Sequence, residues 1–449
     1  MPKIVIIGAG SRNFAKNIIT DVVLYPELRD STIALVDIDK TRLELTADFA
    51  RTIAKQHGFN TKIESTLNRA EALKGADYVI VTIAVGGGRL SGQKITEKYG
   101  LPWDDTVGPN GVFQGNRDIQ TILEIAHDME KICPDAWLLN YSNPMAMICW
   151  AINDYSKVKS VGLCPNQRNQ AFHFSTWLDI PFEEVYYWSA GINHFSFYLR
   201  FEWKGKDAYP LLKEKFKAAG MYNGPDVGVK MDDVKNHLVG VDVVEVEMFK
   251  RFGYFTTGSG GHIPEYVPYF IRTPDLFKKY RLDDFVELAR HMGARRMAEE
   301  ARYIEQLASG YVFPLTNEYR WTIWAVNTIH SLETGTVRKM NLSVKNTGLI
   351  TNLTPGCCVE VPCMVDRGGV HPCYVGDLPP QCAALIQANV NVQQLAVQGI
   401  VEKDKNKLMQ AIMLDPLTRA MLSMDEIKKM TEELFDWEKQ YLVGYKELS

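Results

Sequence analysis

The N-terminal third of the chain alternates short runs of β-branched and aliphatic residues with stretches of helical periodicity. The apolar runs have the length of typical strands and lie at residues 3–7, 32–37, 78–84, 136–141 and 159–163. Helical segments stand between them, for example at residues 13–24 and 119–132. Strands that are spaced by helices predict a parallel sheet with right-handed crossover connections. This part of the sequence therefore indicates a doubly wound α/β fold.

A glycine-rich turn follows the first apolar run. Gly8-Ala9-Gly10-Ser11 lies between a strand pattern and a helix pattern, where backbone amides at the helix N-terminus meet the pyrophosphate of a dinucleotide, although Asn13 replaces the usual third glycine. Asp37 ends the second run, at the place of the carboxylate that binds the adenosine ribose, and an acid there favours NAD over NADP. The alternative is a tight turn and a helix cap without a cofactor. The predicted Rossmann-type NAD site consists of Gly8, Gly10, Ser11 and Asp37.

Composition excludes several classes of protein. The length of 449 residues suggests two or three packed domains, and 46% hydrophobic with 23% charged residues is typical of globular chains. A net charge of -4 and the lack of a long Lys/Arg cluster argue against nucleic acid as a partner. No apolar stretch approaches a signal peptide or a membrane span, so we expect a cytoplasmic protein without a membrane partner. Eight scattered cysteines without a Cys-x-x-Cys pair predict free thiols.

The pattern changes near residue 184, where strand-like runs become more closely spaced. The later segments that we expect to be regular are strands at residues 185–188, 195–201 and 357–365, and helices at residues 282–307, 321–330 and within 377–444. No flexible linker separates the two patterns, so a substrate cleft is expected at their interface. We predict an NAD-binding Rossmann-type domain at residues 1–185 and a C-terminal α+β substrate and oligomerisation domain at residues 186–449.

Polar residues interrupt the apolar pattern at the ends of three strand-like runs. The interruptions read Asn140-Tyr141-Ser142-Asn143-Pro144, Gly162-Leu163-Cys164 and Gly191-Ile192-Asn193-His194. A doubly wound sheet binds its ligand at the carboxyl edge of the strands. We therefore expect these segments to converge near the nicotinamide.

With these segments in place, the chain resembles glycoside hydrolase family 4, the NAD-dependent glycosidases, and especially the melibiase-type α-galactosidases. The resemblance is carried by residues 3–11, 35–42, 133–147, 162–164, 190–197, 248–255, 352–366 and 389–393. It implies a lactate/malate dehydrogenase-like architecture. It also implies a hydrolysis in which NAD oxidises sugar carbon 3 and a base deprotonates carbon 2. The aglycone is then eliminated, water adds, and the hydride returns.

The resemblance also implies a metal and a sugar contact. Cys164 and His194 match the residues that bind a divalent cation, usually Mn²⁺, with substrate oxygens completing the shell; a thiolate and an imidazole suit a transition metal. Asn143 matches an asparagine that contacts the sugar hydroxyls. Without the family, Cys164 and His194 would be interpreted as structural residues, and Asn143 as part of a turn before Pro144.

The base at sugar carbon 2 is expected within residues 253–266. Tyr254 and His262 are the two candidates, and we slightly favour Tyr254. A tyrosine is a credible base only where the metal or another cation lowers its pKa. A purely structural role remains the alternative for both side chains.

The chain differs from the family at positions that are expected to bind the substrate. Pro165 follows the metal cysteine where most members carry His or Asp, so the role in sugar contact or leaving-group assistance is vacant or moved to Asn166 or Gln167. We assign Asn166 to substrate binding. Asn317 replaces an arginine, and glycines precede His262 where melibiase-type sequences carry acids. We therefore expect the substrate to be an α-galactoside or a related glycoside or uronide. Pro165 favours substrates with a good leaving group.

Two other functions stay open at this point. An NAD-dependent sugar or 2-hydroxy acid dehydrogenase that releases NADH would share the fold, but it would need a His–Asp pair and substrate-binding arginines rather than a metal thiolate. A non-catalytic sensor would have little use for the metal pair Cys164 and His194. We expect a small-molecule glycoside as substrate and, as in the family, a homodimer or homotetramer.

Overall fold

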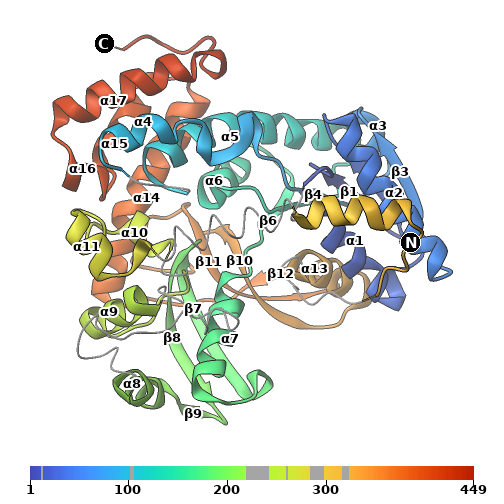
Figure 1. The fold of residues 1–449 in the computed structure, drawn as a ribbon, viewed down its shortest axis with the longest axis horizontal. Coiled ribbons are helices and arrows are strands. Elements are labelled where there is room, and N and C mark those ends of the chain that lie inside the picture. Colours follow the sequence, from blue (N-terminus) through green and yellow to red (C-terminus); the bar gives the residue numbers. More distant parts are fainter. Residues whose placement is uncertain are drawn as a thin grey trace.

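The computed structural model describes residues 1–11, 14–101, 106–218, 242–258, 261–283, 298–315 and 323–448. Asn13, Asn317 and part of the predicted helix at residues 282–307 lie outside these ranges. The element order and the arrangement of helices around the sheet are shown in Figure 1.

Six parallel strands form the N-terminal half of the sheet. They are β1 (Lys3–Ile7), β2 (Thr32–Val36), β3 (Lys62–Thr66), β4 (Tyr78–Val81), β5 (Trp137–Asn140) and β6 (Lys159–Gly162). Their order, β3-β2-β1-β4-β5-β6, is that of the doubly wound dinucleotide-binding fold. The predicted fold class is confirmed. The sequence analysis missed β3, because this polar edge strand lacks the apolar run that marks β1 and β4, which are buried on both faces.

Helices cover both faces of this parallel sheet. The helices up to residue 178 are α1 (Ala15–Leu24), α2 (Lys40–Gln56), α3 (Arg69–Leu73), α4 (Gln93–Lys98), α5 (Gly108–Ile132), α6 (Met145–Tyr155) and α7 (Asn166–Leu178), with 3₁₀ turns η1 (Pro26–Leu28) and η2 (Val85–Ser91). Of these, α7 packs on the strand that begins at Val185 rather than on the parallel strands. Local sequence fixes several of the helix ends. Asp39 caps α2 by accepting the Arg42 N–H at 3.1 Å, and α1 ends at Tyr25, before a proline.

The sheet continues into an antiparallel half. Its strands are β7 (Val185–Ile192), β8 (Phe195–Trp203), β9 (Lys206–Asp207), β10 (Arg338–Lys345), β11 (Cys358–Asp366) and β12 (Gly369–Pro372). One pair, Ser343 with Gly162, joins β10 to β6, and Glu360 with Gly191 joins β11 to β7. Strands on both sides of residue 185 thus share one sheet, and the division at 185/186 stays a prediction.

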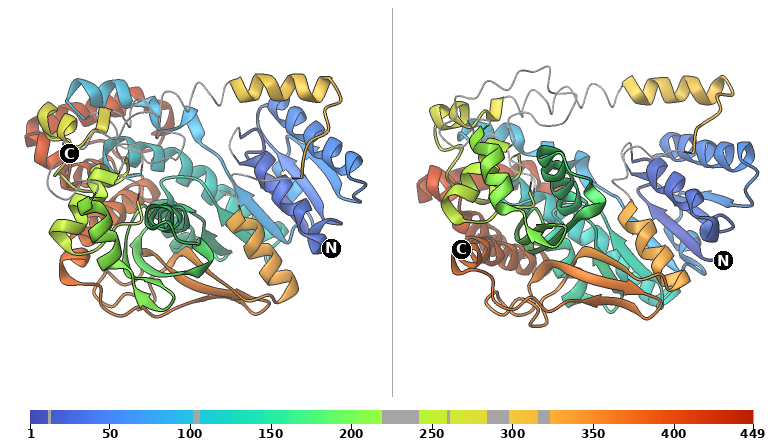
Figure 2. Two further views of the ribbon diagram at one scale, coloured as in Figure 1. Left: turned by 60° about the horizontal axis from the view of Figure 1, so that its bottom comes forward. Right: turned by 90° about the horizontal axis from the view of Figure 1, so that it is seen from below.

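A second set of helices lies in the later part of the chain. They are α8 (Tyr209–Ala218), α9 (Asp242–Phe252), α10 (Ile263–Tyr266), α11 (Pro274–Lys279), α13 (Ile323–Thr334), α14 (Pro380–Val401), α15 (Lys405–Leu414), α16 (Thr418–Met421) and α17 (Met424–Trp437), with 3₁₀ turns η3 (Phe182–Glu184) and η6 (Lys439–Tyr441). Of these, α13, α14, α15 and α17 fold back against the N-terminal half. α14 packs against α5 and α6, and α17 packs against α4 (Figure 1). A helical segment at residues 298–308 lies over α2, where Tyr303 meets Phe49 at 5.5 Å between ring centroids (Figure 2). The two halves are therefore interlocked.

The state of the cysteines and the lengths of the apolar helices bear on two predictions from the sequence. Every cysteine is a free thiol, as predicted. None of the helices in the described ranges is both long and apolar enough to span a membrane.

Gly162 gives a test of the junction between the two halves of the sheet. A Cβ at this position would lie 2.6 Å from both Cys149 Sγ and Met145 Sδ and 2.8 Å from Ser343 Cβ. We expect Gly162→Ala to lower the free energy of unfolding by about 1–3 kcal/mol through overpacking, measured by urea denaturation. Ser160→Ala, on the same strand but half-buried, is the control and should cost less. Equal losses in the two variants would contradict the close packing at this junction.

Candidate functional site

Four parallel strands deliver candidate site residues to one edge of the sheet. Gly8 follows β1, Asp37 follows β2, Asn143 lies beyond β5, and Cys164 lies beyond β6. Because these strands are parallel, their carboxyl ends meet at the same edge, which is where doubly wound folds bind ligands. The structure therefore brings the predicted cofactor, sugar and metal residues to one side of the molecule.

The turn after β1 holds the chain close to its neighbours. Gly8 has a φ of +90°, and a Cβ there would lie 2.8 Å from the Thr82 carbonyl oxygen. The Gly10 N–H donates to Asp37 Oδ2 at 2.7 Å, and the Ser11 N–H donates to the Gly8 carbonyl at 3.0 Å. Since only glycine fits at Gly8, the turn forms a cradle of backbone beside the start of α1, which suits a pyrophosphate.

Asn143 lies on a loop whose shape is fixed by its neighbours. The Asn140 side chain donates to the Ser142 carbonyl at 3.0 Å, and Ser142 Oγ donates to the Ile83 carbonyl at 2.8 Å. Asn143 Oδ1 accepts the Met145 N–H at 3.2 Å, and its peptide bond to Pro144 is cis. The half-buried amide of Asn143 is thus fixed within this loop, which Ser142 ties to the segment after β4.

His194 occupies a strained position in a tight hairpin. Asn193 and His194 are the two turn residues between β7 and β8, since Ile192 pairs with Phe195. His194 has a φ of +62°, a left-handed conformation that costs a non-glycine residue about 1–2 kcal/mol. Gly258 packs on this turn, because a Cβ there would lie 2.1 Å from the His194 carbonyl oxygen. Retaining a strained imidazole where glycine would fit more easily suggests a functional role.

Asn193 joins the two predicted metal ligands to a buried carboxyl group. Its Nδ2 donates to Glu360 Oε2 at 3.0 Å, and its side chain also lies near enough to the Cys164 thiol to act against the rise of that thiol's pKa. Ser196 Oγ donates to Glu360 Oε1 at 3.3 Å. Burial raises the pKa of Glu360 to about 8, and burial together with Glu360 raises the pKa of Cys164 to about 12. The structure thus brings Cys164 next to the turn that carries His194.

His262 lies directly against His194. The two imidazole centroids are 4.1 Å apart, and His262 Nδ1 lies 2.9 Å from Glu265 Oε1. Glu265 is buried, and its Oε2 accepts the Thr106 N–H at 3.1 Å. Burial and the nearby His262 hold the pKa of His194 well below its usual value. A carboxylate at Nδ1 favours the tautomer that leaves Nε2 basic.

Tyr254 is not placed with these residues. Thr256 pairs with Phe197, and the Tyr198 N–H donates to the Phe255 carbonyl at 2.9 Å, so residues 254–258 run antiparallel to β8. Gly258 contacts His194. Tyr254 is four residues earlier in this extended segment, so its backbone lies about 13 Å from that of Gly258 at strand spacing. Its ring instead lies 6.5 Å from that of Tyr209.

The segment after Cys164 begins α7. Pro165 precedes the helix and offers no side-chain proton. Asn166 Nδ2 and both polar side-chain atoms of the fully buried Gln167 have no hydrogen-bond partner. Because buried amides are normally paired, these groups are available to a bound ligand.

Cys164 and His194 are the two side chains that could bind a metal ion at this site. Across the described ranges, no group of three His, Cys, Asp or Glu side chains is close enough to hold a metal. His194 Nδ1 is buried without a hydrogen-bond partner, which fits a nitrogen whose partner is a cation. The donor set therefore suits a metal only if ligands from outside the chain, such as substrate oxygens, complete it.

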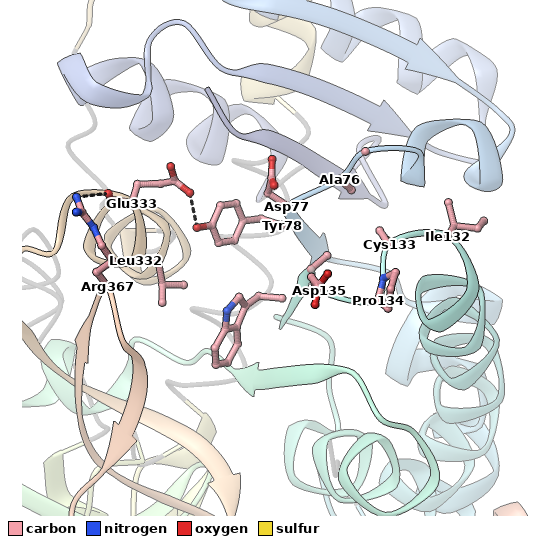
Figure 3. A pocket seen from close by; sticks show the side chains of 13 residues that line it. Ala76, Asp77, Tyr78, Ile132, Cys133, Pro134, Asp135, Leu332, Glu333 and Arg367 are labelled. Carbon is pink, nitrogen blue, oxygen red and sulfur yellow. Dashed lines mark hydrogen bonds between the residues drawn. The ribbon is translucent and has the colours of Figure 1, made fainter.

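A separate pocket opens at the opposite edge of the sheet. It has a volume of about 490 Å³ and lies at the amino ends of β4 and β5, beside Asp77, Asp135, Glu333 and Arg367 (Figure 3). Tyr78 donates to Glu333 at 2.6 Å within it. None of the candidate site residues after β1, β5 and β6 lines this pocket.

Glu360 was not predicted as a site residue, and no role was predicted for Asn193 or Glu265, although both lie in segments that the sequence marked for the site. Glu360 left one local signal, because it is a carboxylate inside the apolar strand β11. A buried carboxyl group in such a strand needs hydrogen-bond partners, and this makes Glu360 a candidate for a structural or functional role. Which partners it meets depends on contacts between distant segments and has no signal in the sequence.

The fold and the site together define a class of protein, namely an enzyme with a doubly wound dinucleotide-binding sheet and a thiol–imidazole pair at its carboxyl edge. The chain belongs to family 4 of the glycosyl hydrolases and is a glycoside hydrolase. The model described as "Family 4 glycosyl hydrolase" matches residues 3–172, and that of the family's C-terminal domain matches residues 189–418.

Relatives with known names support this assignment over the whole chain. An α-galactosidase of Bacillus subtilis is 36% identical over 98% of this chain and 100% of its own. An α-galactosidase of Rhizobium meliloti is 32% identical over 99% of this chain and 89% of its own. The family predicted from sequence is confirmed.

Solved structures support the fold. A 6-phospho-α-glucosidase from gut microorganisms, solved with NAD and Mn²⁺, superimposes with a TM-score of 0.81 at 21% identity and covers 99% of this chain and 100% of its own. Malate dehydrogenase of Plasmodium falciparum gives a TM-score of 0.55 at 13% identity, covering 90% of this chain and 99% of its own. The predicted malate dehydrogenase-like architecture is thus confirmed, as a likeness of fold alone.

The raised pKa of Glu360 predicts a pH dependence of stability. The folded-state pKa of about 8 lies above the ordinary value of 4.5, so the folded protein binds the extra proton. Stability should therefore fall as pH rises from about 5 to about 8, by a few kcal/mol, since each pKa unit corresponds to about 1.4 kcal/mol.

This prediction can be checked by denaturant unfolding of the metal-free protein across that pH range. Glu360→Gln should flatten the decline, whereas Glu183→Gln, at an exposed carboxylate, should leave it unchanged. Identical pH profiles for the wild type and Glu360→Gln would contradict the buried, protonated state of Glu360.

Proposed function

We propose that the protein hydrolyses α-galactosides or closely related glycosides with the help of NAD and a divalent transition metal such as Mn²⁺. The observation that carries this proposal is the link from Cys164 through Asn193 to the strained turn at His194. This link lies at the same sheet edge as the Gly8 turn and Asn143. A dehydrogenase of hydroxy acids has no need of such a thiol–imidazole pair.

The Gly8 turn and Asp37 fit NAD. The absence of a Cβ at Gly8 lets the turn pack directly against Thr82, so that its backbone can lie close to a bound pyrophosphate. Asp37, which accepts the Gly10 and Asp39 N–H groups at 2.7 and 2.9 Å, is held where it can accept ribose hydroxyls. Ser11 precedes α1 and accepts the N–H of the N-cap residue Phe14 on its Oγ at 3.3 Å. When bound, NAD would supply reversible removal of a hydride from sugar carbon 3.

Cys164 and His194 fit a transition metal. The unpartnered, buried Nδ1 of His194 and the thiol of Cys164 form a mixed donor pair that suits Mn²⁺ or a similar cation once substrate oxygens are added. When bound, the cation would polarise the oxygens at sugar carbons 2 and 3. Asn193 and Glu360 would orient the thiol through the hydrogen bonds described above.

His262 is the base that the geometry favours over Tyr254. Its ring lies tilted against that of His194 and its Nδ1 is held by Glu265, so its imidazole would be the group that accepts the proton from sugar carbon 2. Asn143 and Asn166 would hold the sugar hydroxyls from the loops beyond β5 and β6. We expect Pro165, which donates no proton, to make the rate sensitive to the leaving group.

The choice of glycone rests on the relatives. The two α-galactosidases are the more similar, and an α-galacturonidase of Thermoanaerobacter italicus is 26% identical over 99% of this chain and 98% of its own. We therefore place α-galactosides first and α-galacturonides second. As in the family resemblance, we expect a cytoplasmic homodimer or homotetramer.

The test is an assay of aryl α- and β-galactosides, glucosides and uronides with NAD and Mn²⁺ under reducing conditions in deuterium oxide. We expect release of aglycone from the α-galactoside without net NADH, and deuterium at carbon 2 of the product sugar by NMR. Cys164→Ser should lower the rate at least about 100-fold, since it removes a metal ligand, while Cys373→Ser, at a half-buried thiol outside the site, should not. NADH accumulation without aglycone release would make the protein a dehydrogenase.

The base can be identified in the same assay. We expect His262→Gln to lower kcat and deuterium incorporation about 10²–10⁴-fold with NAD affinity unchanged, because only proton transfer is lost. Tyr254→Phe should have little effect, since Tyr254 lies away from His194. The opposite pattern would assign the base to Tyr254 and would require residues 254–258 to rearrange when substrate binds.

A further inference from the structure

The loop after β4 is fixed by two adjacent side chains of α5. Asp118 Oδ1 accepts the Val85 N–H at 2.7 Å, and Arg117 Nε donates to the Val85 carbonyl at 3.0 Å. Both side chains are buried. Because the peptide groups on both sides of Val85 are held, the direction in which the chain enters Gly86 is fixed.

Arg117 is itself held from the far end of the chain. Its guanidinium pairs with Glu438, and both side chains are at most 2% exposed. Arg117 also donates to Gln114 Oε1 at 2.6 Å. The buried ion pair leaves Arg117 little freedom, because moving either partner would leave a buried charge uncompensated.

Residues 438–445, which we call the C-terminal brace, contact both α5 and the loop. A Cβ at Gly86 would lie 2.9 Å from Tyr441 Oη and 2.9 Å from Arg117 Cδ. The Tyr441 carbonyl accepts from Asn116 Nδ2 at 3.3 Å, and the Tyr445 hydroxyl donates to Ile400 O at 3.2 Å. The brace is thus anchored on α5 through Asn116, which is next to Arg117, and on α14 through Ile400.

This loop borders the cofactor turn and the sugar loop. Thr82 Oγ1 donates to the Gly8 carbonyl at 3.0 Å, and Ser142 Oγ donates to the Ile83 carbonyl at 2.8 Å. The segment that leads into Val85 is therefore bonded on one side to the Gly8 turn and on the other to the loop of Asn143. A shift of the loop would change the shape of the proposed NAD site.

We propose that the C-terminal brace positions the NAD-binding site, with Glu438 acting through Arg117 on the loop at Val85. This inference rests on the proposed function, because it requires that NAD binds beside Gly8. Glu438 and Tyr441 are positioning residues. The metal pair, Cys164 and His194, lies beyond β6 and β7 and is held by Asn193 and Glu360 rather than by the brace.

The experiment compares NAD and Mn²⁺ binding to the full-length protein. NAD affinity is measured by calorimetry, Mn²⁺ affinity by electron paramagnetic resonance, and the melting temperature is recorded in parallel. For Glu438→Gln we expect about a tenfold weaker NAD affinity, with Mn²⁺ affinity within twofold of the wild type. Glu447→Gln is the matched control, because Glu447 is 86% exposed and pairs with Lys405 at the surface.

A second variant is needed because Glu438→Gln could fail to fold. Tyr441→Ala leaves the buried ion pair intact and removes the ring beside Gly86, so it should weaken NAD binding severalfold with Mn²⁺ binding unchanged. Unaltered NAD affinity in both variants would overturn the inference, as would parallel losses of NAD and Mn²⁺ affinity, which indicate a general structural role. Failure of the wild type to bind NAD would instead overturn the proposed function.

Discussion

The junction between the parallel and antiparallel halves of the sheet is the constraint on which the site depends. Gly162 faces Ser343 and Gly191 faces Glu360 at this junction. Each of these two strands then carries a candidate metal ligand within three residues, Cys164 after Gly162 and His194 after Gly191. Cys164 and the turn that carries His194 are therefore brought near each other where the parallel and antiparallel parts of the one sheet join. The buried Glu360, contributed by the joining strand, ties both through Asn193.

Much of the fold could be predicted from sequence because its signals are local. Continuous apolar runs such as Lys3–Ile7 mark parallel strands buried on both faces, and the Gly8 turn follows from its place between strand and helix. The family resemblance supplied Cys164 and His194. The link through Asn193 to Glu360 could not be predicted, since the two residues are 167 positions apart and no local pattern fixes such a contact.

The choice between Tyr254 and His262 shows where sequence reasoning is weakest. Both residues lie in one short segment, and which of them meets His194 depends on the direction of the chain after the strand. Gly258 lies against the His194 carbonyl, and the ring of His262 lies against that of His194. Spacing along the sequence does not encode these contacts. The slight preference for Tyr254 therefore rested on the family and on side-chain chemistry rather than on position.

The buried pair of Arg117 and Glu438 has a consequence for how the chain matures during synthesis. A ribosome that has reached residue 437 has exposed all of α5 to solvent but has not yet supplied the carboxylate that neutralises Arg117. Until then the guanidinium favours water, and the middle of α5 resists burial. The packing of α5 around Arg117 is therefore complete only once Glu438 can reach it. Nascent or prematurely ended chains are consequently incomplete at the very loop that borders Gly8.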